Sequence, residues 1–114
     1  MALTYNLLKV NAISDNDAQF ARQVVTLFIE EVPFEIKNMK DGLRKKNHQK
    51  VYHAAHKIKP TLDLLGMDLA YEDVLTIEAW TRAEGKKKEI KEVIKSLKLQ
   101  VDQTVRELIK DYNL

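Results

Sequence analysis

Residues 48–66 read HQKVYHAAHKIKPTLDLLG. The apolar residues in this segment recur at spacings of four, three, four and three: Val51, Ala55, Ile58, Leu62 and Leu65. Such spacing places side chains on one face of an α-helix. Gly66 can adopt the left-handed conformation that commonly ends a helix. The segment therefore predicts an amphipathic helix from about His48 to Leu65.

Helical signals continue on the N-terminal side of this segment. Residues 14–17, Ser-Asp-Asn-Asp, have the side chains of a helix start, because serine caps a helix and acidic groups favour its positive end. Pro33 is expected to begin a second helix, since its fixed φ suits a first turn, and Asn47 to end it after the cations at 44–46. The apolar positions of these two helices are Phe20, Ala21, Val24, Val25, Leu27, Phe28, Ile36, Met39 (or Lys40) and Leu43.

On the C-terminal side, Asp68 is expected to cap a helix that ends near Gly85, and a last helix is expected from about Lys87 to Tyr112. Short connections between long amphipathic helices imply antiparallel neighbours. We therefore expect an all-α protein formed by residues 1–114 as one domain. In it, residues 1–13 form a lead-in, either a short helix or extended, and residues 14–112 form an antiparallel four-helix bundle.

Composition excludes several classes of protein. The chain has 114 residues, of which 45% are apolar, and 19 Lys and Arg against 17 Asp and Glu give a net charge of +2. This balance argues against a nucleic-acid partner. The Lys86–Lys88 run is expected to be a solvated turn, because glutamates interrupt it. There is no cysteine and no apolar run of the roughly 20 residues that cross a bilayer, so we expect a cytoplasmic protein without a membrane partner.

A second stripe of side chains, which is polar, follows the apolar face of the 48–65 helix at the next residue of each turn. Successive residues are rotated by about 100° around the helix axis, so this stripe borders the apolar face. It consists of Tyr52, His56, Lys59 and Asp63. A neutral imidazole, with an ordinary pKa of about 6.5, is a nucleophile near pH 7. An ammonium one turn away can balance the charge of a phosphoryl group that the imidazole accepts. The spacing alone is common, and most polar helical residues are simply surface.

Residues 53–67, HAAHKIKPTLDLLGM, resemble the signature of histidine-containing phosphotransfer (HPt) domains. The family pattern is roughly A-H-x-L-K-G-[ST], followed by a glycine and an apolar residue. Ile58 stands where leucine is usual, Gly66-Met67 gives the closing pair, and four positions match in type: Ala55, His56, Lys59 and Thr61. The number, length and order of the expected helices extend the resemblance over about residues 14 to 112. The segment 20–31, followed by Pro33, resembles the helix that precedes the site in this family.

The resemblance implies a phosphorelay carrier in two-component signalling. His56 would be the phosphorylated residue and Lys59 its charge partner. The phosphoryl group would come from the aspartyl phosphate of a response-regulator receiver domain, as found in hybrid histidine kinases, and pass to another receiver. Mg²⁺ would belong to the receiver, so no cofactor is expected in this chain. We expect a monomer that is not itself an enzyme, since no glycine-rich phosphate loop is present.

One residue departs from the family pattern. Pro60 stands where glycine is usual, four residues after His56, and it cannot donate to the His56 carbonyl. A local kink or a loosened turn is expected there. His53 is expected to be a polar neighbour of the site. With His56 it supplies only two metal ligands, and Asp63 lies too far along the helix to add a third, so no metal site is expected.

Two other functions compete with the phosphocarrier. One is a helical adaptor that docks receiver domains without being phosphorylated, and Pro60 is the feature that favours it. The other is a general helical interaction module or DNA-associated module, which the balanced charge argues against. Outside the motif, His48 is expected to be solvated and Trp80 to pack at a helix edge. Excess apolar surface on the 14–32 helix is expected to help dock a partner.

Overall fold

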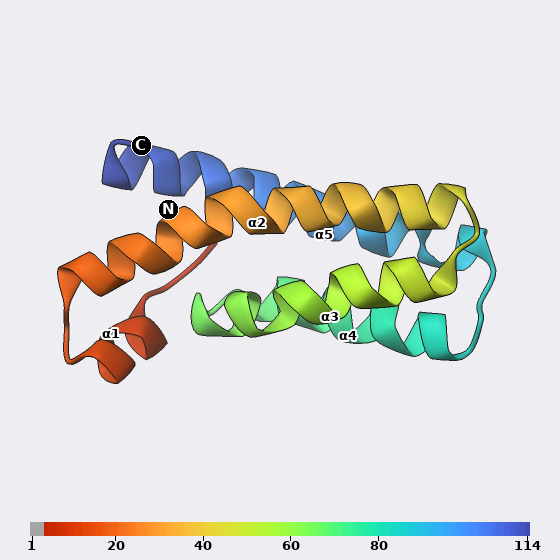
Figure 1. Cartoon of the computed structure of the whole chain (residues 1–114), viewed down its shortest axis with the longest axis horizontal. Helices are drawn as coiled ribbons and strands as arrows, with labels where there is room; N and C mark the ends of the chain where they lie inside the picture. Colours follow the sequence, from red (N-terminus) through yellow and green to blue (C-terminus); the bar gives the residue numbers. More distant parts are fainter. Residues whose placement is uncertain (1–3) are drawn as a thin grey trace.

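The computed structural model describes residues 4–114, and within that range it contains five helices and no strand (Figure 1). They are α1 (Leu8–Ser14), α2 (Ala18–Arg44), α3 (His48–Leu64), α4 (Asp68–Arg82) and α5 (Lys87–Tyr112). The four long helices run alternately up and down the molecule, and α1 is a short helix before them. The expected all-α, antiparallel four-helix bundle with a short N-terminal helix is therefore confirmed.

Pro33 does not begin a new helix. It lies inside α2, which continues through it for 27 residues, so the expected division at Pro33 is wrong. A proline in a helix interior costs about 3 kcal/mol. Each large apolar side chain that is fully buried contributes about 1.5–3 kcal/mol. The inner face of α2 is buried on both sides of the proline, by Phe28 and Val32 before it and Ile36 and Met39 after it. This burial outweighs the cost of the proline.

The apolar positions before Pro33 divide between core and surface. Ala21, Val24, Val25 and Phe28 are buried, Phe20 is half-buried, and Leu27 is exposed. After Pro33, Met39 and not Lys40 takes the inward position.

The ends of the helices differ in detail from the expected ones. Ser14 is the last residue of α1, and Asp17 is the N-cap of α2. Asn47 is the N-cap of α3, where its side chain accepts from the Lys50 backbone N–H at 3.0 Å; it does not end α2. Asp68 is the first residue of α4 and does not cap it. Gly66 has the expected left-handed conformation, with φ of 64°.

Asp17 caps the N-terminus of α2 through its side chain. Its carboxylate accepts from the backbone N–H groups of Gln19 at 2.9 Å and Phe20 at 3.3 Å, two groups that have no partner within the helix. We expect Asp17→Ala to lower the free energy of unfolding by about 1 kcal/mol, measured by urea denaturation. Glu30→Ala, on the exposed side of the same helix, is the control and should change it by less than about 0.5 kcal/mol. Equal effects of the two substitutions would contradict the assignment of the cap.

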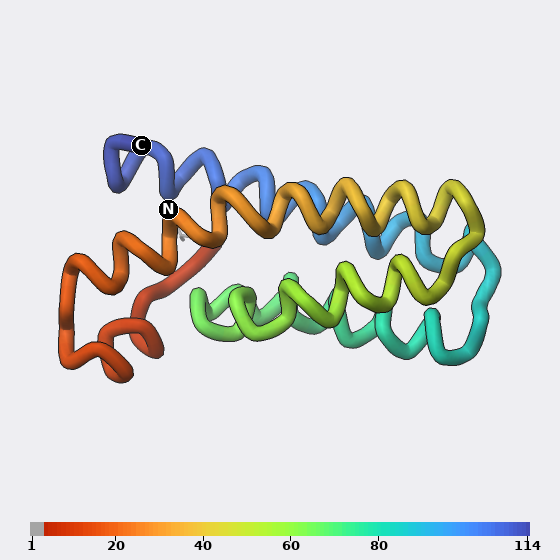
Figure 2. Tube along the Cα trace, viewed as in Figure 1, coloured from red at the N-terminus to blue at the C-terminus, as the bar shows by residue number. Residues whose placement is uncertain are grey.

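Each long helix packs against the two beside it, in the closed order α2, α3, α4, α5 and back to α2. The α2–α3 and α4–α5 turns lie together at one end of the bundle, and the α3–α4 turn lies toward the other (Figure 2). Side chains from all four helices fill the centre, among them Phe28, Ile58, Ile77 and Leu97, all fully buried.

The N-terminal segment closes the end of the bundle where α3 turns into α4. Val10 of α1 is fully buried, and the Asn6 backbone N–H donates to the Leu65 carbonyl at 2.8 Å. A Cβ on Gly66 would lie 2.3 Å from the Asn6 side chain, so this glycine also makes room for the segment. Among residues 4–114, no helix combines the length and apolarity needed to cross a membrane.

Candidate functional site

His56 lies near the middle of α3 with its side chain 58% exposed. Its Nδ1 atom is 3.0 Å from Oε2 of Glu78 on α4. On the preceding turn of α3, the Tyr52 ring stacks against the imidazole, with centroids 5.4 Å apart and planes 13° apart. The ring is therefore held on one edge and one face, and a large part of it remains open to solvent.

Glu78 links His56 to Lys59. Its other carboxylate oxygen, Oε1, accepts from Lys59 Nζ at 2.9 Å, so one carboxylate binds both side chains. The Glu78 side chain is only 3% exposed and that of Lys59 is 24% exposed. We call His56, Glu78 and Lys59 the carboxylate-linked triad. Two of its members come from α3 and the third from α4, which packs directly against it.

The charges in the triad support one another. Burial alone would raise the pKa of Glu78, but the hydrogen bonds from Lys59 and His56 outweigh burial and lower that pKa. The hydrogen bond to Glu78 likewise raises the pKa of Lys59. Glu78 is therefore an ionised carboxylate at neutral pH, and the ammonium of Lys59 neutralises it.

The ionised carboxylate determines which imidazole nitrogen can react. A carboxylate without a proton only accepts hydrogen bonds. Nδ1 of His56 must therefore carry the hydrogen and donate it to Glu78. In the neutral ring the lone pair is then on Nε2, for which no hydrogen-bond partner is found among residues 4–114. The geometry presents Nε2 as the nucleophilic atom.

The other residues singled out from the sequence lie at varying distances from this triad. Tyr52 is part of the site, and His53 is exposed and meets the Tyr52 ring edge-on at a centroid distance of 5.9 Å. Asp63 pairs with Lys9 of α1 at 2.5 Å, so the fourth member of the polar stripe is bound elsewhere. Pro60 is exposed, and the turn around it remains helical, because α3 continues to Leu64. The local kink or loosened turn expected at Pro60 stays a prediction, since Pro60 cannot donate to the His56 carbonyl.

Glu78 was not predicted as a site residue, although the sequence contains a signal for it. The inward positions of α4 include Ala70, Val74 and Ile77, and Glu78 follows Val74 at a spacing of four, which places it on the buried face. An acidic residue in a buried stripe needs a partner. The partners cannot be identified without knowing that α3 packs against this face of α4.

Within 4–114, no three His, Cys, Asp or Glu side chains are grouped closely enough to bind one. The triad contains one histidine and one carboxylate, and its third member is a cation. The arrangement is suited to holding an imidazole in one tautomer beside a neutralised carboxylate.

No known protein-family model, curated protein or solved structure matches this chain significantly. The geometry of the triad and the motif around His56 are therefore the basis for the function proposed below.

The triad predicts a pH dependence of stability. Because the pKa of Glu78 is lower in the folded protein than its ordinary value of 4.5, Glu78 stabilises the fold above pH 4.5. This contribution is lost as the pH falls through the lower, folded pKa. We expect urea denaturation between about pH 6 and 3 to show a shallower loss of stability in Glu78→Gln than in the wild type. Other carboxylates, such as Asp41, whose pKa is lowered by hydrogen bonds from Lys50 and Arg44, contribute equally to both proteins. Parallel curves would contradict an ionised, paired Glu78.

Proposed function

We propose that this protein is an HPt-like phosphocarrier that accepts a phosphoryl group on Nε2 of His56. The observation that carries the proposal is the exposed imidazole whose Nδ1 is bound by the buried, ionised Glu78. A histidine fixed in this way has its reactive nitrogen directed away from the core. The match of Ala55, His56, Lys59 and Thr61 to the HPt motif supports the same conclusion.

The transfer step needs no additional base, because the attacking Nε2 atom carries no proton. The Nε2 lone pair attacks the phosphorus of an aspartyl phosphate, the N–P bond forms, and the P–O bond to the aspartate breaks. The electron pair leaves with the receiver's carboxylate. The imidazole becomes a cation that keeps its Nδ1 hydrogen, and Glu78, which already accepts that hydrogen, stabilises the positive ring. Transfer to a second receiver is the same step in reverse.

Lys59 has two roles in this proposal. It neutralises Glu78, so that the carboxylate does not repel the incoming phosphoryl group. It also lies one helical turn from His56, within reach of the same external group. Since its side chain is partly exposed, the ammonium can turn toward phosphoryl oxygens while the imidazolium takes over the pairing with Glu78.

The proposed partners are response-regulator receiver domains, including those of hybrid histidine kinases, and they supply the Mg²⁺ ion. In this proposal the chain is a carrier that acts in the cytoplasm and has no kinase activity of its own. Leu27 and Phe34, large apolar residues of α2 that are 46% and 59% exposed, offer apolar surface on which a receiver would dock.

A transfer experiment tests the proposal. Receiver domains are phosphorylated with radiolabelled phosphate, purified from the donor and mixed with the chain. We expect at least one receiver to transfer label within minutes. The labelled bond should be labile to acid and stable to base, as a phosphohistidine is. Label that is instead stable to acid, or no transfer from any receiver of the source organism, would contradict the proposed function.

A second candidate, a docking adaptor that is never phosphorylated, is favoured by Pro60. Its exposed ring lies one turn after His56 and presents a rigid apolar surface where the HPt motif has glycine. The adaptor would bind receivers, measured by calorimetry, and accept no label. The same transfer experiment therefore separates the two functions.

A further inference from the structure

Although the net charge is close to zero, the basic and acidic residues are unevenly distributed along the chain. Residues 37–50 and 86–98 together hold twelve of the nineteen Lys and Arg residues, but only three of the seventeen acidic residues. The remainder of the chain is correspondingly acidic. Because α2 and α5 are neighbours, and because the end of α2 and the start of α5 lie at the same end of the bundle, the two basic segments come together (Figure 1).

A groove of about 930 Å³ runs between these two segments, and we call it the α2/α5 groove. Two of its cations are already neutralised, since Arg44 pairs with Asp41 and Lys98 pairs with Asp102 at 2.6 Å. Five others form no ion pair with any residue of the described range 4–114: Lys37, Lys40, Lys87, Lys91 and Lys95. These like charges repel one another, and an anionic partner would remove the repulsion.

The groove also has an apolar lining. Leu43 and Ile94, which belong to the core, line it, and so does Leu99, which is 61% exposed. The aliphatic stems of the lysines extend this surface. The groove is therefore lined by both apolar and cationic side chains, and Asp41 and Glu92 are its acidic residues.

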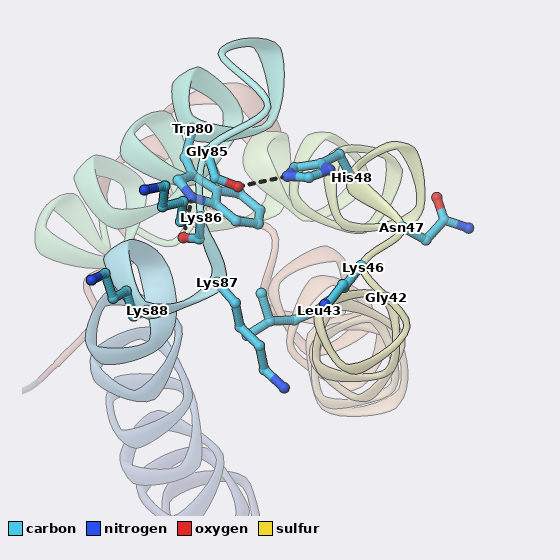
Figure 3. A pocket seen from close by; sticks show the side chains of 10 residues that line it. All are labelled: Gly42, Leu43, Lys46, Asn47, His48, Trp80, Gly85, Lys86, Lys87 and Lys88. Atoms are coloured by element: carbon cyan, nitrogen blue, oxygen red, sulfur yellow. Dashed lines mark hydrogen bonds between the residues drawn. The ribbon is translucent and has the colours of Figure 1, made fainter.

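A smaller cavity of about 380 Å³ continues the groove at the end of the bundle and shares Leu43 and Lys87 with it (Figure 3). Trp80 forms one wall, with its Nε1 donating to the Lys86 carbonyl at 2.9 Å. The His48 ring packs against Trp80 with centroids 4.7 Å apart, and its Nε2 lies 2.8 Å from the Gly85 carbonyl, so His48 is half-buried and not the solvated residue expected from the sequence. The Lys86–Lys88 run borders this cavity, and the basic face is broader than the sequence indicated.

We propose that the α2/α5 groove binds an acidic amphipathic helix of a partner protein. The α5 residues along the groove, from Lys87 to Leu99, span about 20 Å, the length of three to four helical turns. A helix with leucines on one face and acidic residues beside them would cover Leu99 and pair with the free lysines. A DNA backbone would use the cations but not the apolar lining. A membrane surface is flat and would not enter a concave site.

This site is independent of the phosphocarrier function. The carboxylate-linked triad lies between α3 and α4, whereas the groove lies between α2 and α5, on the opposite side of the bundle. A helix bound in the groove would therefore leave His56 exposed to a receiver domain.

A designed peptide tests the proposal. It has about 18 residues, with leucine at i, i+3, i+4 and i+7 and glutamate at most other positions, and carries a fluorophore for anisotropy. A scrambled peptide of the same composition is measured beside it. We expect the ordered peptide to bind with a micromolar dissociation constant. The double variant Lys91→Glu with Lys95→Glu should weaken binding at least tenfold, and Leu99→Ser at least threefold. The double variant Arg106→Glu with Lys110→Glu makes the same change of charge on α5 outside the groove and should change binding less than twofold.

Four outcomes would overturn the proposal. The first is equal binding of the ordered and scrambled peptides, because charge alone would then be sufficient. The second is an equal loss of binding in the two double variants. The third is tighter binding to a 20-base-pair DNA duplex or to phosphatidylserine vesicles than to the ordered peptide. The fourth is no binding of the ordered peptide at 100 µM.

Discussion

The substitution His56→Gln is expected to abolish phosphoryl acceptance, with labelling reduced at least about 10³-fold. Glutamine has a similar reach, and its amide can still donate to Glu78, so the helix packing around the site is retained. It has no nitrogen lone pair that can attack phosphorus, because the amide nitrogen is conjugated with its carbonyl. The measurement is the initial rate of label transfer from a phosphorylated receiver, with far-UV circular dichroism as the check on folding.

His53→Gln is the matched control for this experiment. It removes an exposed histidine from the same helix, one turn earlier, which has no bond to Glu78. We expect it to keep a labelling rate within about threefold of the wild type. If His56→Gln is labelled as well as the wild type, His56 is not the acceptor. If the two variants lose label equally, the motif alone does not identify the reactive residue.

Most of the fold follows from helical periodicity, and the exceptions have physical causes. The apolar spacings around Val51–Leu65 and Ile90–Leu108 predicted α3 and α5 to within a residue or two, because each helix buries a single stripe. The predicted division at Pro33 was wrong because the prediction considered only the effect of proline on the local backbone. The side chains that hold α2 together across it pack against other helices, which local sequence does not reveal.

The site could be predicted only in part, for a related reason. His56 and Lys59 are neighbours on one helix, so their common position followed from spacing alone. Their link through Glu78 depends on which face of α4 meets α3, which is a property of the packed bundle. Asp63 illustrates the converse: it belongs to the same stripe as His56, yet it pairs with Lys9, a partner brought near by the course of the N-terminal segment.

The same limitation affects the charge. A net charge of +2 averages over the whole chain, so it does not reveal a basic surface formed by part of it. The α2/α5 groove arises because antiparallel packing places the end of one helix beside the start of another. Two basic segments about 50 residues apart in sequence thereby become one surface.

Glu78→Gln is expected to slow phosphoryl acceptance by about 10- to 100-fold without abolishing it, an effect of the size found when the partner that orients a metal-bound histidine is removed. The amide that this substitution introduces can either donate to or accept from Nδ1, so the tautomer of His56 is no longer fixed. The loss of the negative charge also removes the stabilisation of the imidazolium that forms in the transfer step. Both effects fall on the rate of transfer, and receiver binding should be retained.

The chain offers a close control, since Glu35 is also a buried glutamate and pairs with Lys57 at 3.1 Å, on the side of α3 toward α2. Glu35→Gln should cost a comparable amount of stability and change the transfer rate less than about twofold. Two readouts, the transfer rate and nitrogen-15 NMR of the imidazole, then separate a role in positioning His56 from general destabilisation of the fold. Nitrogen-15 NMR of the imidazole should show the hydrogen on Nδ1 in the wild type and in Glu35→Gln, and a mixture of tautomers in Glu78→Gln. If Glu78→Gln instead transfers at the wild-type rate with Nδ1 still protonated, Glu78 is only a structural residue. The orientation of His56 must then come from its stacking on Tyr52.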